Sequence, residues 1–250
     1  MSRVRIYQIA VVAGFILLLE ALCLAGVIDK VTMPPPHIIF RDFFRMISAG
    51  RYFDEIAKTM LNVLTAFALA FVIGTLTGTV LHGYRTAREI LDPLFATYYA
   101  IPVFAFYPLF IVIFGLGDGP QLLIGYMLGV VAVIVTILNG LDRVPNVLKK
   151  TARINRLGPL QTALKVTLPF CAPYLLTAAK LALAYALIGV IGSEFILAHA
   201  GMGYEIGFAY TNFDNATMYP LILLVLLISI VANGLMSWWE TVLLTRRGIK

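Results

Sequence analysis

Six long apolar blocks divide the chain, and they constrain its fold more than any other feature of the sequence. The blocks cover residues 6–28, 60–81, 93–114, 122–141, 174–196 and 219–244. Each approaches the ~20 residues that an α-helix needs to cross the hydrocarbon core of a bilayer. A helix satisfies its backbone N–H and C=O groups internally, which matters because lipid offers them no partner. The blocks therefore predict an all-α integral membrane protein with six transmembrane helices.

The composition agrees with one polytopic membrane domain. Hydrophobic residues make up 60% of the 250 residues and charged residues only 13%, whereas soluble domains carry about 25% charged residues. We expect a single transmembrane domain over residues 1–250, with its core at about 60–244. The first block follows Arg3 and Arg5, as in a signal peptide. Because that block is as long as a full span, we expect it to be a retained helix.

Prolines predict two departures from a simple helical bundle. Pro102 and Pro108 interrupt the third block, so this span should be kinked or broken. Its freed carbonyl groups then need partners from neighbouring helices or from a water-filled cavity. Three consecutive prolines at 34–36 form a stiff segment after the first block, and the amphipathic pattern over 38–47 follows them. That pattern predicts a short helix on the membrane surface.

The distribution of Lys and Arg residues orients the spans. If both termini are cytoplasmic, the inside loops hold thirteen of the 19 basic residues, and cytoplasmic loops of membrane proteins are enriched in such residues. The inside set is Arg3, Arg5, Arg85, Arg88, Arg143, Lys149, Lys150, Arg153, Arg156, Lys165, Arg246, Arg247 and Lys250. The outside set is Lys30, Arg41, Arg45, Arg51 and Lys58, while Lys180 lies within a span. No basic groove with stacking aromatics can be drawn, so we expect no nucleic-acid binding.

The inside loop at about 142–168 is the longest and the most basic of the cytoplasmic loops. Its pattern predicts a helix, a turn and a second helix. Leu168 and Pro169 should then start a new membrane helix, with proline allowed in its first turn. Such an element makes a compact projection on the cytoplasmic face. We expect it to sit in a groove of a soluble partner and to transmit rigid-body motion.

Four segments together resemble one transporter family. They are LDPLFATYYAIPVFAFYPLFIVIFGLG at 91–117, LPFCAPYLLTAAKLALAYA at 168–186, IGSEFILAHAGMGYEIGFA at 191–209 and MPPPHIIFRDF at 33–43. In these segments the chain resembles the permease subunits of binding-protein-dependent ABC importers, in the nitrate, sulfonate and taurine group. The resemblance covers nearly the whole chain. It implies the MetI-like permease architecture, with a cytoplasmic coupling helix.

The inside loop resembles the family's coupling loop in place but departs from its motif, E-A-A-x-x-x-G. Counted back from the Leu-Pro pair at 168–169, the motif falls on Lys150, Thr151, Ala152 and Arg156. A lysine thus replaces the acidic residue and an arginine the glycine. Either the docking is rebuilt with opposite charge, or this chain pairs with a second, non-identical permease. The resemblance implies that the ATPase-coupling residues are Val147, Lys149, Lys150, Thr151, Ala152, Arg153, Arg156 and Gly158, the last serving as the glycine after a two-residue shift.

The resemblance also implies the partners and the location. Two permease chains, either two copies or this chain with a homologous permease, would enclose a pathway lined mainly by the third and fifth spans. No Walker motif is present, so separate cytoplasmic ATP-binding subunits would use the ATP and Mg. A solute-binding protein outside the cytoplasm would deliver the solute. The permease would span the bacterial inner membrane, with both termini in the cytoplasm.

The candidates for lining or gating the pathway are Tyr99, Pro102, Phe106, Pro108, Lys180 and Glu194. Each has a plainer interpretation. The aromatic residues between 98 and 110 can simply pack between helices, Lys180 can reach the headgroup region, and Glu194 can pair near the outer interface.

Catalysis is not suggested by any motif in the chain. His37, His82 and His199 are scattered, Cys23 and Cys171 share no metal-ligand spacing, and no phosphate-binding loop is present. We therefore expect no enzyme activity and no cofactor or metal bound by this chain. The alternative function is a six-span channel or a membrane subunit that captures substrate, and a channel would have no need of the cytoplasmic projection. The sequence does not identify the solute.

Overall fold

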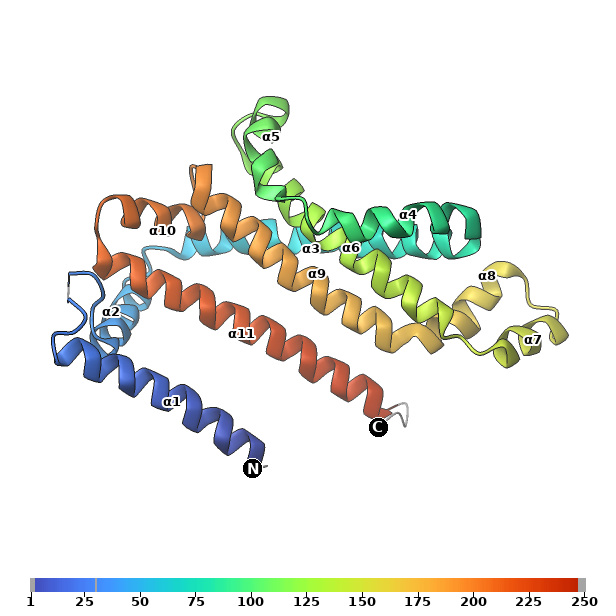
Figure 1. Ribbon diagram of the computed structural model, residues 1–250, viewed down its shortest axis with the longest axis horizontal. Coiled ribbons are helices and arrows are strands. Elements are labelled where there is room, and N and C mark those ends of the chain that lie inside the picture. Colours follow the sequence, from blue (N-terminus) through green and yellow to red (C-terminus); the bar gives the residue numbers. More distant parts are fainter. Residues whose placement is uncertain (1–2, 30, 247–250) are drawn as a thin grey trace.

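The computed structural model describes residues 3–29 and 31–246, and its regular elements there are all helical (Figure 1). Lys30, Arg247 and Lys250, which enter the charge count above, lie outside the described residues. The elements are α1 (Arg3–Leu24), α2 (Pro36–Ala49), α3 (Phe53–Gly83), α4 (Arg85–Tyr98), the 3₁₀ turn η1 (Val103–Phe106), α5 (Tyr107–Phe114), α6 (Asp118–Asp142), α7 (Asn146–Ile154), α8 (Pro159–Thr162), the π-helical turn η2 (Ala163–Thr167), α9 (Leu168–Leu197), α10 (Met202–Thr211) and α11 (Asn215–Arg246).

Within the described residues, five helices are long and apolar enough to cross a membrane. They are Ile6–Leu24, Phe53–Gly83, Asp118–Asp142, Ala163–Ile196 and Asn215–Leu243. A sixth span exists if the bent pair Arg85–Tyr98 and Val103–Phe114 is counted as one, and the two halves of this pair meet at 89°. The predicted break in the third span is thus confirmed. Its physical cause is Pro102, which lacks an N–H and disfavours helical backbone at Ile101.

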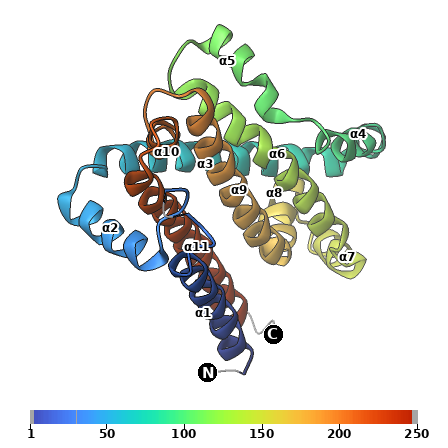
Figure 2. The ribbon, with the colours of Figure 1, turned by 60° about the vertical axis from the view of Figure 1, so that its left-hand side comes forward.

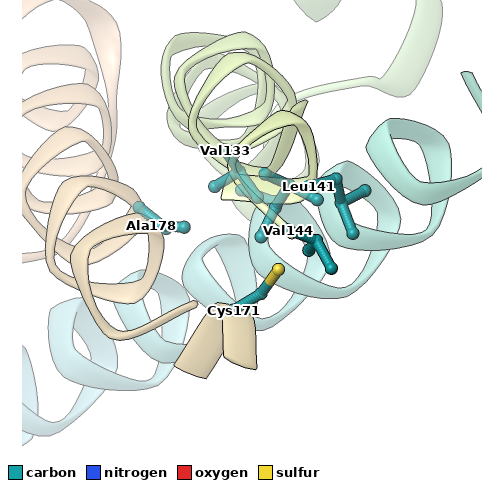
Figure 3. Packing of buried hydrophobic residues seen from close by; sticks show 8 residues of the cluster. Val133, Leu141, Val144, Cys171 and Ala178 are labelled. Carbon is teal, nitrogen blue, oxygen red and sulfur yellow. The ribbon is translucent and has the colours of Figure 1, made fainter. Parts of the chain in front are cut away.

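The core of the bundle is formed by α3, α6 and α9, which pack closely because small residues line their contacts. A Cβ added to Gly189 of α9 would lie 2.6 Å from the Cα of Gly125 on α6, and one added to Gly74 of α3 would lie 2.8 Å from Val133. Lipid gives helices no hydrophobic reason to associate, so close backbone approach of this kind supplies the packing energy. Figure 3 shows part of this core, in which Val133, Leu141 and Cys171 belong to one buried cluster.

The amphipathic segment after the prolines forms α2, as predicted, and α2 lies across the end of the bundle where α3 and α11 begin (Figure 2). Its apolar residues Phe43, Met46 and Ile47 pack on the cluster that joins α10 to α11. The long helix α1 stands apart from the bundle, with 6% of its apolar stretch buried.

The predicted start of the fifth span is confirmed, because α9 begins at Leu168 with Pro169 in its first turn. The second helix of the loop is continuous with α9. It begins at Pro159 and runs through the π-helical turn Ala163–Thr167 directly into α9. A π-helical turn shifts the hydrogen-bond register locally, which lets the helix continue past Pro169 although proline has no N–H to donate.

Candidate functional site

The broken span carries four of the predicted pathway residues. Tyr99 and Pro102 lie at the break, and Phe106 and Pro108 lie at the junction of η1 and α5, where the chain turns away from the bundle (Figure 1). All four are exposed on this chain. The neighbouring aromatics behave differently, because Tyr107 and Phe110 are buried against Ile124 of α6. The aromatic segment therefore divides into a face that packs on the bundle and a face that is free for another contact.

Helix α4, the other half of the broken span, is loosely seated. All its residues are at least partly exposed, and a cavity of about 290 Å³ lies between it and α6, lined by Asp92, Phe95, Tyr99 and Asn139 among others. Close to the break, the Tyr98 hydroxyl donates a 2.8 Å hydrogen bond to the Met127 carbonyl of α6.

A charged cluster joins the start of α4 to the end of α6, where the loop at 142–168 begins. The guanidinium of Arg88 donates two hydrogen bonds to the carboxylate of Asp142, at 2.6 and 2.7 Å. His82, at the end of α3, lies 3.3 Å from the same carboxylate, and Asp92 lies 3.5 Å from Arg88. Bidentate pairs of this type fix geometry as well as charge. Asp142 is the last residue of α6, so a displacement of the coupling loop can reach α4 through this pair.

The helix α7 presents two faces, and the predicted coupling residues divide between them. Ala152 is buried and Leu148 packs against the bundle core. Val147 and Ile154 are 71% and 80% exposed, and Lys150 and Thr151 are exposed between them. Residues at this spacing share one side of a helix. An exposed side with two apolar residues and a cation is therefore available to a partner.

The helix α7 ends in a left-handed cap at Arg156. Arg156 has a positive φ of 52°, a backbone conformation that favours glycine. The Arg156 N–H bonds to the Arg153 carbonyl at 2.9 Å, and the Leu157 N–H bonds to the Ala152 carbonyl at 3.0 Å. These two bonds define a Schellman cap, which usually has glycine at this position. The left-handed position that ends α7 is thus occupied by Arg156, and Gly158 lies two residues beyond it.

Glu194 lies 1% exposed near the end of α9, at the opposite end of the bundle from the coupling loop. Its carboxylate accepts hydrogen bonds from the Thr59 hydroxyl at 2.8 Å and from the Gly203 N–H at 3.0 Å. Thr59 in turn accepts one from the Met202 N–H at 2.8 Å. The carboxylate therefore holds the α9–α10 turn against α3. Beside this turn, burial and Glu55 raise the pKa of Glu205 above its ordinary value.

Lys180 pairs with Glu240 of α11 at 2.8 Å, with both side chains partly buried. An ion pair inside the bundle joins α9 to α11, so this lysine does not simply extend to the headgroups. The six predicted pathway residues consequently lie in three places. Four are at the exposed break, Lys180 is in the ion pair with Glu240, and Glu194 is in the buried hydrogen-bond cluster with Thr59 and Gly203. Sequence reasoning missed Arg88, Asp142, Thr59 and Glu240, since each acts through a partner more than fifty residues away.

Within the described ranges, no group of three His, Cys, Asp or Glu residues is placed to hold a metal ion.

Residues 70–246 match the family described as "Binding-protein-dependent transport system inner membrane component". The chain belongs to this family. The family resemblance inferred from the sequence is confirmed. The chain is the membrane-spanning permease subunit of an ABC importer. Permeases of this family work with ATP-binding partner subunits.

Relatives and solved structures agree with this assignment. The permease is 23% identical to a probable ABC transporter permease protein of Haemophilus influenzae, over 94% of this chain and 96% of the relative. It is 28% identical to the putative aliphatic sulfonates transport permease protein SsuC of Bacillus subtilis, over 72% and 66%. It is 24% identical to the nitrate import permease protein NrtB of Leptolyngbya laminosa, over 74% and 67%. Its fold is similar to a chain of the MetNI methionine ABC transporter in an inward-facing conformation, with a TM-score of 0.63 at 20% identity, over 79% of this chain and 95% of that chain.

Proposed function

We propose that two permease chains, either two copies or this chain with a homologous permease, enclose the solute pathway around the broken span and α9. The support is the free face of the break, where Tyr99 and Phe106 are 53% and 38% exposed between two helices that together are long and apolar enough to cross a bilayer. Non-helical backbone at membrane depth is tolerated where it is buried in protein or lines a water-filled cavity. A solute delivered by an extracytoplasmic binding protein would pass along this face.

The exposed side of α7 is the docking surface for a cytoplasmic ATPase in this proposal. Val147 and Ile154 supply apolar contact area, and Lys150 supplies a charge opposite to that of the family motif. The partner surface should then offer a carboxylate where relatives offer a cation. ATP and Mg are used by the partner, and the permease itself performs no catalysis. Both termini lie in the cytoplasm, and the chain spans the bacterial inner membrane as a single transmembrane domain.

The Arg88–Asp142 pair gives the proposal its mechanism and is the observation that carries it. Closure of the ATPase dimer moves α7, and α7 is joined by Arg143, Val144 and Pro145 to Asp142 at the end of α6. Asp142 holds Arg88 of α4, and α4 leads into the break. A displacement in the cytoplasm can thereby open or close the pathway face.

Purification of the tagged chain from native membranes in mild detergent tests the proposal. We expect an ATPase with a Walker motif and a solute-binding protein to co-purify, and the number of permease species distinguishes a homodimer from a heterodimer. Replacing Val147 and Ile154 together with Asp should release the ATPase, whereas Asn155→Asp, in the same loop, should not. Recovery of the chain alone, active in liposomes without ATP, would leave the channel as the function.

A further inference from the structure

A groove with three arginines lies at the end of the bundle opposite the coupling loop, and no function assigned above uses it. The groove has a volume of about 450 Å³ and separates α2 from the first turn of α11. Its lining residues are Arg41, Asp42, Arg45, Met46, Ala49, Arg51, Tyr52, Ala216 and Thr217. We propose that this groove binds the phosphate headgroup of an anionic phospholipid.

The charge of the groove favours an anion. The guanidiniums of Arg41 and Arg45 lie 3.2 and 3.8 Å from Asp42, which is largely buried and orients them. Arg51 stacks over the ring of Tyr52 at 5.4 Å. The Asp42 carboxylate is thus shared by Arg41 and Arg45. Arg51 interacts electrostatically with Glu205 of α10. Guanidinium groups match phosphate through two parallel hydrogen bonds, which makes arginine the side chain best suited to this headgroup.

The backbone around the groove adds a second attraction for negative charge. Ala216 and Thr217 belong to the first turn of α11, a helix of 32 residues. The N-terminus of a long helix carries a partial positive charge that favours an anion, and here the Asp214 carboxylate already accepts the Thr217 N–H at 3.1 Å. Arginines from α2 and the 50–52 turn therefore converge with a helix N-terminus on one cavity.

The level of the groove in the membrane identifies the source of the phosphate. The apolar spans α1, α3 and α11 all end or begin beside it, at Leu24, Phe53 and Asn215, so the groove lies at the headgroup level whichever side of the membrane it faces. The exposed Phe40 and Phe44 of α2 lie between two sides of this helix. One side packs on the bundle through Phe43 and Ile47, and the other carries Arg41 and Arg45. An interfacial helix with this arrangement places aromatic rings among acyl chains and its cations among the headgroups.

The number of arginines is also unusual for their place in the chain. Arg41, Arg45 and Arg51 are three of the five basic residues assigned to the non-cytoplasmic side, where such residues are generally depleted. An anionic ligand in the groove gives these charges a partner in addition to Asp42. An acidic loop of a protein partner would satisfy the same charges, but it would leave Phe40 and Phe44 without a role.

The test is native mass spectrometry of the purified permease released from nanodiscs. The discs contain either phosphatidylcholine alone or phosphatidylcholine with phosphatidylglycerol, and a third sample receives inorganic phosphate in place of the anionic lipid. We expect phosphatidylglycerol to be retained about tenfold more than phosphatidylcholine, as expected for a charge-assisted guanidinium–phosphate contact. Retention of inorganic phosphate without any preference for phosphatidylglycerol would overturn the lipid assignment, and so would equal retention of the two lipids.

Matched variants tie the retained lipid to this groove. The triple variant Arg41→Gln, Arg45→Gln, Arg51→Gln should lose the preference, and the control Arg85→Gln, Lys150→Gln, Arg153→Gln, which removes the same charge from exposed cytoplasmic positions, should keep it. Ala49→Trp fills the groove without changing any charge and should lose the preference as well, which guards against misfolding of the triple variant. If Ala49→Trp and the triple variant both retain phosphatidylglycerol like the wild type, the groove is not the site. These outcomes do not depend on the importer function, because no ATPase or solute is present.

Discussion

Buried polar contacts at single residues connect helices that are far apart in sequence, and the hydroxyl of Thr59 is the clearest case. It donates to Glu194 of α9 and accepts from the N–H of Met202 on α10, all within a site that is almost fully buried. In such a site each polar group has few other partners, so losing one leaves the others unsatisfied. The contact between Thr59, Glu194 and Met202 should therefore be weakened by removal of the Thr59 hydroxyl alone.

Thr59→Val keeps the shape of the side chain and removes the hydroxyl. We expect the free energy of unfolding to fall by about 1–3 kcal/mol, because one buried acceptor and one buried donor lose their partner. Thermal unfolding in a fixed detergent measures the change. The control is Thr79→Val, whose hydroxyl bonds to the Thr75 carbonyl of the same helix at an exposed position. If the free energy of unfolding falls equally in both variants, the Thr59 hydroxyl does not stabilise the contact between α3, α9 and α10.

Arg156 shows the reverse situation, since its side chain costs stability. A residue other than glycine in left-handed backbone is disfavoured by about 1 kcal/mol. We therefore expect Arg156→Gly to raise the protection of α7 against hydrogen exchange. Arg153→Gly removes the same side chain from the helical part of α7 and should lower protection there. Equal effects of the two substitutions would contradict the Schellman cap.

At the scale of elements, the broken span α4–η1–α5 is held to the bundle both by apolar packing and by a charged contact. The pair of Arg88 and Asp142 joins α4 to α6 across a helix contact that also contains a cavity. Partly exposed ion pairs contribute little to stability, typically less than ~1 kcal/mol. Removing this pair should consequently affect coupling much more than folding.

Arg88→Gln and Asp142→Asn each test this coupling role in the complete importer. We expect ATP-driven uptake of the solute carried by the co-purified binding protein to fall several-fold, while ATP hydrolysis and assembly persist. The exchanged pair Arg88→Asp with Asp142→Arg should restore part of the uptake. Arg85→Gln is the matched control, because Arg85 pairs with Glu89 on its own helix at 2.8 Å and is mostly exposed. Uptake that follows the hydrolysis rate in every variant would remove the coupling role.

The elements were predictable from the sequence to the extent that local physics defines them. Apolar length marks the spans, Pro102 marks the break, and the apolar pattern over 38–47 marks α2. The join between α8 and α9 was not predictable, since the π-helical turn at 163–167 has no simple sequence signal. The pairs Arg88–Asp142 and Lys180–Glu240 could not be predicted from the sequence either. A charge that looks isolated in sequence finds its partner only when packing sets the register of two helices.

At the scale of the whole molecule, the chain consists of a packed bundle and one helix that stands away from it. The buried clusters bring together α3, α6 and α9 at the centre and α2, α10 and α11 at one end. Helix α1 reaches α2 mainly through Glu20, whose carboxylate lies 2.6 Å from His37 Nδ1 and also accepts the His37 N–H. An apolar helix can remain apart in this way because lipid, unlike water, does not penalise its exposed surface.

Glu20→Ala should therefore detach the end of α1 without loosening the bundle. We expect hydrogen exchange to rise in peptides that cover residues 25–36, because the carboxylate that fixes the start of α2 is gone. Peptides from α6 and α9 should keep their protection, since their small-residue contacts do not involve α1. The measurement is hydrogen exchange by mass spectrometry in nanodiscs, and Glu89→Ala, which removes a carboxylate from the exposed side of α4, is the control. Faster exchange throughout α6 and α9 in Glu20→Ala alone would mean that α1 supports the core, and the division into a bundle and a separate helix would then be wrong.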